Sequence, residues 1–119
     1  MHVKLQKGVI YLNTVILKNS MKECLLQAFK NNAIITSDGL SKDEFIHVCE
    51  HKAYYEDGGC LGSFSEANEF LQSQDWTHRY DWYIIGYLTE EEVEAIRVMR
   101  KKPRIYENYK EELNKILKI

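Results

Sequence analysis

The most strand-like run of this chain lies in Asp75-Trp76-Thr77-His78-Arg79-Tyr80-Asp81-Trp82-Tyr83-Ile84-Ile85-Gly86-Tyr87-Leu88, which also holds both tryptophans and three of the eight tyrosines. Apart from one glycine, residues 82–88 are aromatic, β-branched or aliphatic, with no proline and no charge, which favours a strand. Because this run is apolar on both faces, it is typical of an interior strand covered on both sides. We therefore expect the other elements to pack around a central strand at residues 82–88.

The N-terminal segment predicts a β-hairpin. Residues 3–5 and 9–17 are rich in Val, Ile, Leu and Tyr, and the segment 6–8 between them supplies a turn glycine. A further short strand is expected at residues 33–36, where a Ser-Asp-Gly turn follows.

Four capping-box sequences predict helix starts. In each, a hydroxyl can accept from the backbone N–H three residues on, and the glutamate there can bond back to the cap. Apolar residues at helical spacing follow every box. The boxes are Ser20–Glu23, Ser41–Glu44, Ser63–Glu66 and Thr89–Glu92. A fifth helix is expected with Pro103 in its first turn.

These elements predict one α+β domain over residues 1–119. Its sheet is expected to be small and mixed or antiparallel, made of the N-terminal hairpin and the strand at 82–88, and packed with about five helices. A chain of 119 residues can bury a core without disulfides or metal. The second of these helices, which starts at the Ser41 box, is expected to bury Phe45, Val48 and Cys49.

Composition indicates a cytoplasmic protein. The three cysteines, Cys24, Cys49 and Cys60, are widely spaced and odd in number, which fits free thiols in a reducing compartment. No apolar run approaches the length of a membrane span, and the N-terminus lacks the pattern of a secretory signal. The formal net charge of −2 argues against nucleic-acid binding by the whole surface.

Aromatic and charged residues alternate just before the central strand. Trp, Tyr and Arg concentrate binding energy at protein interfaces, so this segment predicts a partner-binding edge. The expected contact residues are Trp76, Arg79, Tyr80 and Trp82, with Tyr54, Tyr55, Glu56 and Asp57 as an acidic-aromatic neighbour. Residues 51–88 carry two Lys or Arg against six Asp or Glu, so a basic partner would suit this part of the chain.

A glycine-rich loop offers a second kind of site. Glycines allow backbone N–H groups to turn towards a ligand, and a helix start attracts anions. The residues concerned are Gly58, Gly59, Gly62 and Ser63. They lack the lysine of a phosphate-binding P-loop and the spacing of a dinucleotide fingerprint, so a turn followed by a helix cap is the alternative interpretation.

The basic residues at the end of the fourth expected helix offer a third kind of site. They are Arg97, Arg100, Lys101, Lys102 and Arg104. Acidic residues begin this helix and basic residues end it, as the helix dipole favours, yet a compact basic end could also grip phosphates. Residues 88–101 resemble the helix that follows the DNA-binding domain in small phage-type repressors, although no helix-turn-helix precedes them.

Two histidines are the only candidates for metal ligands in the sequence. His47 and His51 would share one face of the expected second helix, which suits bidentate metal capture. No full set of converging ligands accompanies them, so we expect no metal and no other cofactor.

The chain also lacks a catalytic motif. We therefore expect a non-enzymatic protein-binding module, an adaptor or inhibitor of the kind common in phage and other mobile elements. The alternatives left open are a nucleic-acid-binding regulator using the fourth helix, and a nucleotide or small-molecule binder at residues 58–63. The apolar stripe of the C-terminal helix could also join two copies of the chain.

Overall fold

The computed structural model describes residues 17–41, 43–103 and 107–118. These residues form a six-stranded antiparallel sheet in the order β1-β6-β2-β3-β4-β5. The strands are β1 (Leu17–Asn19), β2 (Ala33–Ser37), β3 (Ile46–Cys49), β4 (Lys52–Tyr55), β5 (Cys60–Gly62) and β6 (Trp82–Tyr87). The helices are α1 (Met21–Asn31), α2 (Phe64–Gln72), α3 (Asp75–Arg79), α4 (Glu90–Met99) and α5 (Tyr109–Leu117). The prediction of an α+β fold is confirmed, but the sheet is larger than expected.

Strand β6 is an interior strand, as its composition predicts. It pairs with β1 on one side and β2 on the other, so that Ile84 lies opposite both Leu17 and Ile35. The register between β2 and β6 shifts between Ile34 and Ile35, so that Ile85 of β6 has no residue of β2 directly opposite it. Ile84 and Ile85 are both buried, in different hydrophobic clusters.

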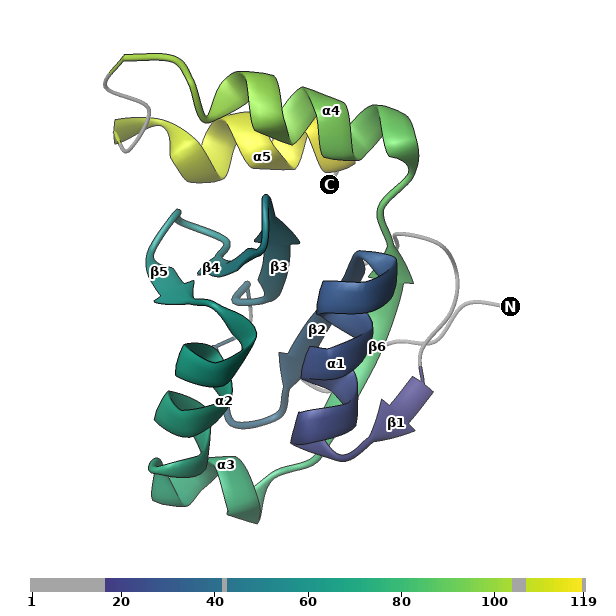
Figure 1. The fold of residues 1–119 in the computed structure, drawn as a ribbon, viewed down its shortest axis with the longest axis vertical. Coiled ribbons are helices and arrows are strands. Elements are labelled where there is room, and N and C mark those ends of the chain that lie inside the picture. Colours follow the sequence, from purple (N-terminus) through teal and green to yellow (C-terminus); the bar gives the residue numbers. More distant parts are fainter. Residues whose placement is uncertain (1–16, 42, 104–106, 119) are drawn as a thin grey trace.

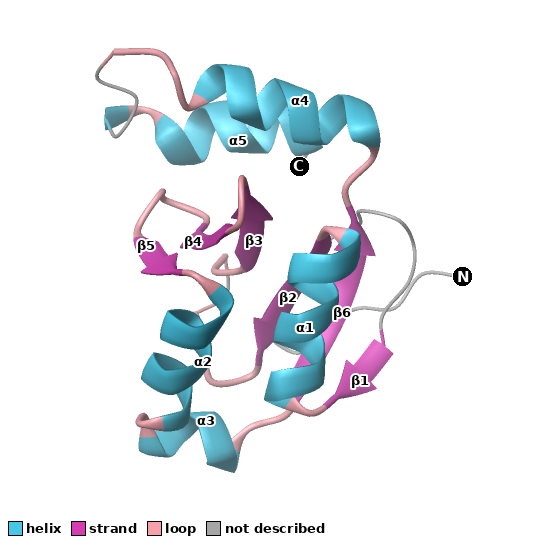
Figure 2. Cartoon of the chain, in the orientation of Figure 1, coloured by secondary structure: helices cyan, strands magenta, loops and turns pink. Residues whose placement is uncertain are grey.

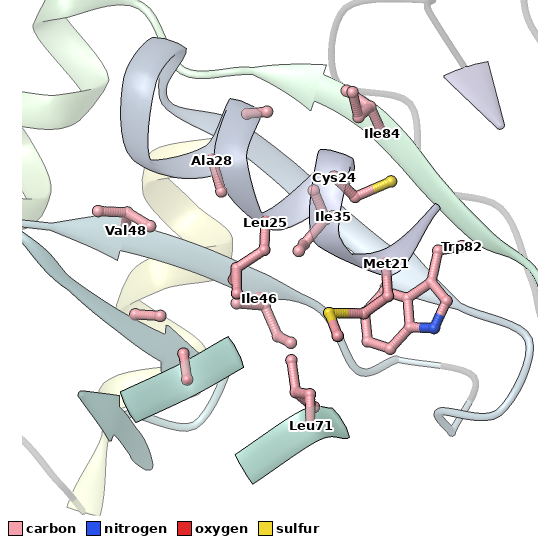
Figure 3. Close-up of a cluster of buried hydrophobic side chains, with 13 residues drawn as sticks. Met21, Cys24, Leu25, Ala28, Ile35, Ile46, Val48, Leu71, Trp82 and Ile84 are labelled. Atoms are coloured by element: carbon pink, nitrogen blue, oxygen red, sulfur yellow. The ribbon is translucent and has the colours of Figure 1, made fainter. Parts of the chain in front are cut away.

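The sheet separates two hydrophobic clusters. One joins β-strand residues to α1 and α2, and Figure 3 shows part of it, with Leu25, Ile35, Ile46 and Trp82 converging. The other joins the sheet to α4 and α5, which lie together at one end of the molecule (Figure 1). All four residues of β3 are buried: Ile46 and Val48 belong to the cluster with α1 and α2, and Cys49 belongs to the cluster with α4 and α5.

Three of the four expected helix starts are confirmed. The Ser20 side chain accepts from the Glu23 amide, and α2 and α4 begin with reciprocal capping boxes at Ser63 and Thr89. The prediction of a helix after Ser41 is wrong. Glu44 does bond back to the Ser41 amide at 2.6 Å, but this closes only a turn before β3.

The reason for this error is the pattern that follows the box. Phe45, Ile46, Val48 and Cys49 can be read at helical spacing, but in the fold they alternate between the two faces of a buried strand. Burial on both faces outweighs the local signal, because a cap contributes only about 1 kcal/mol. Figure 2 shows strands and connecting loops where a helix was expected.

The remaining differences lie in short elements and at the chain ends. Strand β5 and helix α3 were not expected. The N-terminal hairpin lies outside the described residues, except for Leu17 in β1. Helix α5 begins only at Tyr109, and its apolar stripe is buried within this chain at Tyr109, Leu113 and Leu117. Within the described ranges no helix has the length and apolar character needed to cross a membrane.

Candidate functional site

A basic depression lies between the end of α4 and the β3–β4 hairpin. Its volume is about 310 Å³. It is lined by Glu50, Lys52, Tyr54, Arg97, Arg100 and Lys101. Four of these side chains are cationic and one is anionic, in a chain whose formal net charge is −2. Two segments far apart in sequence, 50–54 and 97–101, therefore combine into a concentrated positive region.

Arg100 is the cation of this depression that packs against aromatic side chains. Its guanidinium carbon lies 3.6 Å from the centre of the Tyr54 ring, a close cation–π contact. Its Nη1 donates to the Tyr109 hydroxyl at 3.2 Å. Two aromatic side chains thus hold the guanidinium in one position.

Behind Arg100, a buried hydrogen-bond chain continues to His47. The Tyr109 hydroxyl lies 2.9 Å from Nε2 of His47, whose side chain is fully buried. Burial, and secondarily the charge of Arg100, lowers the pKa of His47 to about 3, so the imidazole is neutral at neutral pH. Burial raises the pKa of Tyr109 to about 12, so the phenol keeps its proton.

These protonation states give the hydrogen-bond chain a direction. Tyr109 accepts from Arg100, so its own proton is free to be donated to Nε2 of His47. The imidazole proton then sits on Nδ1, which has no hydrogen-bond partner among the described residues. The Tyr54 backbone lies near enough to favour the protonated ring and to oppose part of the lowering of the His47 pKa, although it does not meet the geometry of a hydrogen bond to Nδ1.

The β3–β4 turn has an unusual backbone. Glu50 and His51 have φ values of 48° and 67°, the left-handed region that two-residue hairpin turns require and glycine or asparagine normally supplies. This turn places Lys52 beside the depression. Lys52 and Glu50 were not predicted as site residues, because a helix was expected in this part of the chain.

The basic residues expected to bind nucleic acid fall into three groups. Arg97, Arg100 and Lys101 line the depression, but the Arg97 guanidinium is paired with Glu94. Lys102 is exposed but does not line the depression. Arg104 lies outside the described residues. Nucleic-acid binding by this end of α4 stays a prediction.

The expected partner-binding segment is only partly exposed. Arg79 is exposed and Tyr80 is 48% exposed, as expected. Trp76 is half-buried and stacks on Trp82, with ring centres 5.7 Å apart. Trp82 is only 2% exposed, and its indole N–H donates to the Thr77 carbonyl at 3.2 Å. The expectation of Trp82 as a contact residue is therefore wrong, because its side chain completes the core.

The proposed acidic-aromatic neighbour of this segment is also mostly internal. Tyr54 and Glu56 are buried, and Glu56 accepts from the Phe45 amide at 3.1 Å. Tyr55 is half-buried, and Asp57 is exposed. Figure 1 shows the β4–β5 turn near α5, at the other end of the molecule from α3. The structure therefore does not join these residues to the α3 segment as one surface.

Packing accounts for the first glycine of the glycine-rich loop. Gly58 has φ 92°, and a Cβ there would lie 2.9 Å from Cγ of Tyr109. Only glycine combines this backbone conformation with so close an approach to the ring. Gly58 is thus required for seating Tyr109, the residue that orients Arg100.

The chain's own carboxylates occupy the loop amides that an anion would use. Ser63 N donates to Glu66 Oε1 at 2.9 Å, and Ser63 Oγ accepts from Glu66 N. Gly59 N donates to Asp57 Oδ1 at 2.9 Å. Gly62 has φ 93°, and a Cβ there would meet the Glu66 carboxylate at 2.7 Å. The turn and helix cap are therefore sufficient to explain this loop.

The two histidine candidates do not form a metal site. His47 is buried in β3, whereas His51 is exposed in the β3–β4 turn, so the expected shared helix face does not exist. Across the described ranges, no three His, Cys, Asp or Glu side chains are grouped to hold a metal ion. Cys24 and Cys49 are buried, Cys60 is exposed, and all three thiols are free.

Comparisons with protein-family models, with curated proteins and with solved structures found no match to this chain.

Proposed function

We propose that this protein is a non-enzymatic binding module, an adaptor or inhibitor, which captures a protein partner through α3 and the residue after it. The observation that supports this best is the exposed pair Arg79 and Tyr80 beside the half-buried Trp76. Arg, Tyr and Trp are the residue types that concentrate binding energy at interfaces. The free cysteines are consistent with action in the cytoplasm.

The segment is also rigidly supported. Trp76 stacks on the buried Trp82, and a Cβ on Gly39 would lie 2.6 Å from the Trp76 ring and 2.8 Å from that of Tyr80. The two aromatic rings therefore rest closely on the backbone between β2 and β3. Side chains held in this way lose little conformational freedom on binding, which favours affinity.

A comparison of two surface variants tests the proposal. The tagged protein, with Arg79→Ala and Tyr80→Ala combined, is compared with Phe70→Ala in affinity capture from the native host. Phe70 on α2 is a matched control because it is 46% exposed, close to the 48% of Tyr80. We expect the double variant to lose a partner that the wild type and the control retain, with all three melting at similar temperatures.

Two results would contradict the proposal. One is the absence of any partner that is enriched with the wild type. The other is retention of the partner by the double variant, which would place the contact elsewhere.

A further inference from the structure

We propose that the depression between α4 and the β3–β4 hairpin is a binding site for a phosphate group, held by Arg100, Lys101 and Lys52. This site is separate from the α3 surface and shares no residue with it. Three features of the depression support this site: its excess of positive charge, the fixed position of Arg100, and the hairpin that brings Lys52 beside the end of α4.

The charges of the depression are not balanced by the protein. Arg97 is paired with Glu94, but no described carboxylate forms an ion pair with Lys52, Arg100 or Lys101. Glu50 supplies one negative charge, and the carbonyl end of α4 adds about half an elementary charge of the same sign. Glu66, which does not line the depression, also attracts Lys52 without forming an ion pair with it. The three remaining cations exceed these terms. An anion in the depression would relieve their mutual repulsion.

Arg100 is arranged to donate to such an anion. The contacts with Tyr54 and the Tyr109 hydroxyl fix the plane of its guanidinium, yet the hydrogen bond to Tyr109 uses only one of its several N–H groups. A planar fork of N–H donors matches two oxygens of a phosphate. Because the guanidinium is already ordered, less conformational entropy is lost when a ligand binds.

The hydrogen-bond chain behind Arg100 keeps this donor in place. Tyr109 is buried, and its hydroxyl is held between Arg100 and the neutral His47. Because the imidazole is uncharged, it adds no positive charge that would repel the guanidinium. Arg100 thus remains beside the depression without a carboxylate partner.

The tight β3–β4 turn determines where Lys52 lies. Two successive non-glycine residues, Glu50 and His51, adopt the left-handed conformation that a Cβ disfavours. Such strain often accumulates at functional sites, where the surrounding structure maintains it. Here the strained turn presents Lys52 towards the residues of α4.

The size of the depression bears on the ligand. Its volume of about 310 Å³ is at the lower end of small-molecule sites, which suits a phosphate with one attached group. A nucleotide and a nucleic-acid backbone both present this chemistry. The test therefore uses inorganic phosphate, a nucleoside diphosphate and a short single-stranded oligonucleotide as separate probes.

The key variant combines Lys52→Ala with Lys101→Ala. Both lysines are exposed, so their removal is expected to leave the fold intact, whereas Arg100 is packed on Tyr54. Lys22→Ala with Lys30→Ala is the matched control, because it removes the same charge from exposed positions on α1. Binding of each probe is measured by titration calorimetry at low and at moderate salt, and melting temperatures are recorded.

We expect at least one probe to bind, with affinity about tenfold or more lower in the Lys52/Lys101 variant and unchanged in the α1 control. Binding of the diphosphate would identify a nucleotide as the source of the phosphate, and binding of the oligonucleotide alone would identify a nucleic acid. Binding should survive the Arg79/Tyr80 double substitution, which separates this test from that of the α3 surface.

Three results would overturn the inference. They are the absence of binding by every probe at low salt, an affinity that does not change in the Lys52/Lys101 variant, and an equal loss in the α1 control. The last would mean that net charge alone attracts the probe.

Discussion

Mild acid should destabilise this fold through the buried imidazole of His47. In the folded protein its pKa is about 3, whereas the ordinary value is 6.5. The unfolded chain therefore binds the proton more tightly, and the free energy of unfolding must fall as the pH falls between these two values. The stabilising effect is complete above the unfolded pKa and is progressively lost towards the folded one.

The size of the effect follows from the same two values. With an unfolded pKa of 6.5, protonation of the unfolded chain should lower the free energy of unfolding by about 2 kcal/mol between about pH 8 and about pH 5. Typical domains are stable by about 5–15 kcal/mol, so this loss is large enough to measure. Burial raises the pKa of Glu56, which has the opposite effect at the acidic end of this range. That contribution is common to all variants and cancels in their comparison.

The assay is urea unfolding followed by tryptophan fluorescence at several pH values. His47→Gln should be less stable than the wild type at about pH 8, but should lose about 2 kcal/mol less on acidification. His51→Gln is the control, because His51 is exposed in the adjacent turn, and it should keep the wild-type pH dependence. Equal pH dependence in His47→Gln and the wild type would refute the reasoning. So would an NMR titration of the wild type that shows His47 protonating near its ordinary pKa.

Two further predictions concern stability. Gly58→Ala should lower the free energy of unfolding by about 1–3 kcal/mol, since its φ is 92° and the new Cβ would meet the Tyr109 ring, while Gly59→Ala should cost less in the same urea assay. Thr89→Ala should cost about 1 kcal/mol by removing the α4 cap and should speed amide exchange in the first turn of α4, whereas Ser65→Ala, an exposed substitution within α2, should change neither. An unchanged unfolding midpoint in Gly58→Ala or Thr89→Ala would contradict the role assigned to that residue.

The parts of the fold that the sequence predicts are those set by local interactions. The caps at Ser20, Ser63 and Thr89 act within one helical turn. The run at 82–88 is almost entirely apolar, which predicts a buried element. The prediction of a helix after Ser41 was wrong because the residues that follow this capping box are buried by two hydrophobic clusters on opposite faces of the sheet. Only the arrangement of the sheet shows that burial on both faces.

The site residues were harder to predict because they depend on topology. Lys52 and Arg100 are distant in sequence and meet only because the β3–β4 hairpin approaches the end of α4. The positive φ of Glu50 and His51 has no signature in these residue types. Trp82 was assigned to the surface with its neighbours, because composition alone does not separate an exposed tryptophan from one that begins a buried strand.

The position of β6 in the sheet has a consequence for how the chain is made. β6 lies between β1 and β2, although both precede it by many residues, so neither can complete its pairing until residues 82–87 have left the ribosome. Until then, the emerging polypeptide presents two open strand edges, which are prone to pair with other chains. A chain that is truncated before Trp82 should therefore aggregate. In the full chain, β6 is inserted last between β1 and β2 and pairs with both.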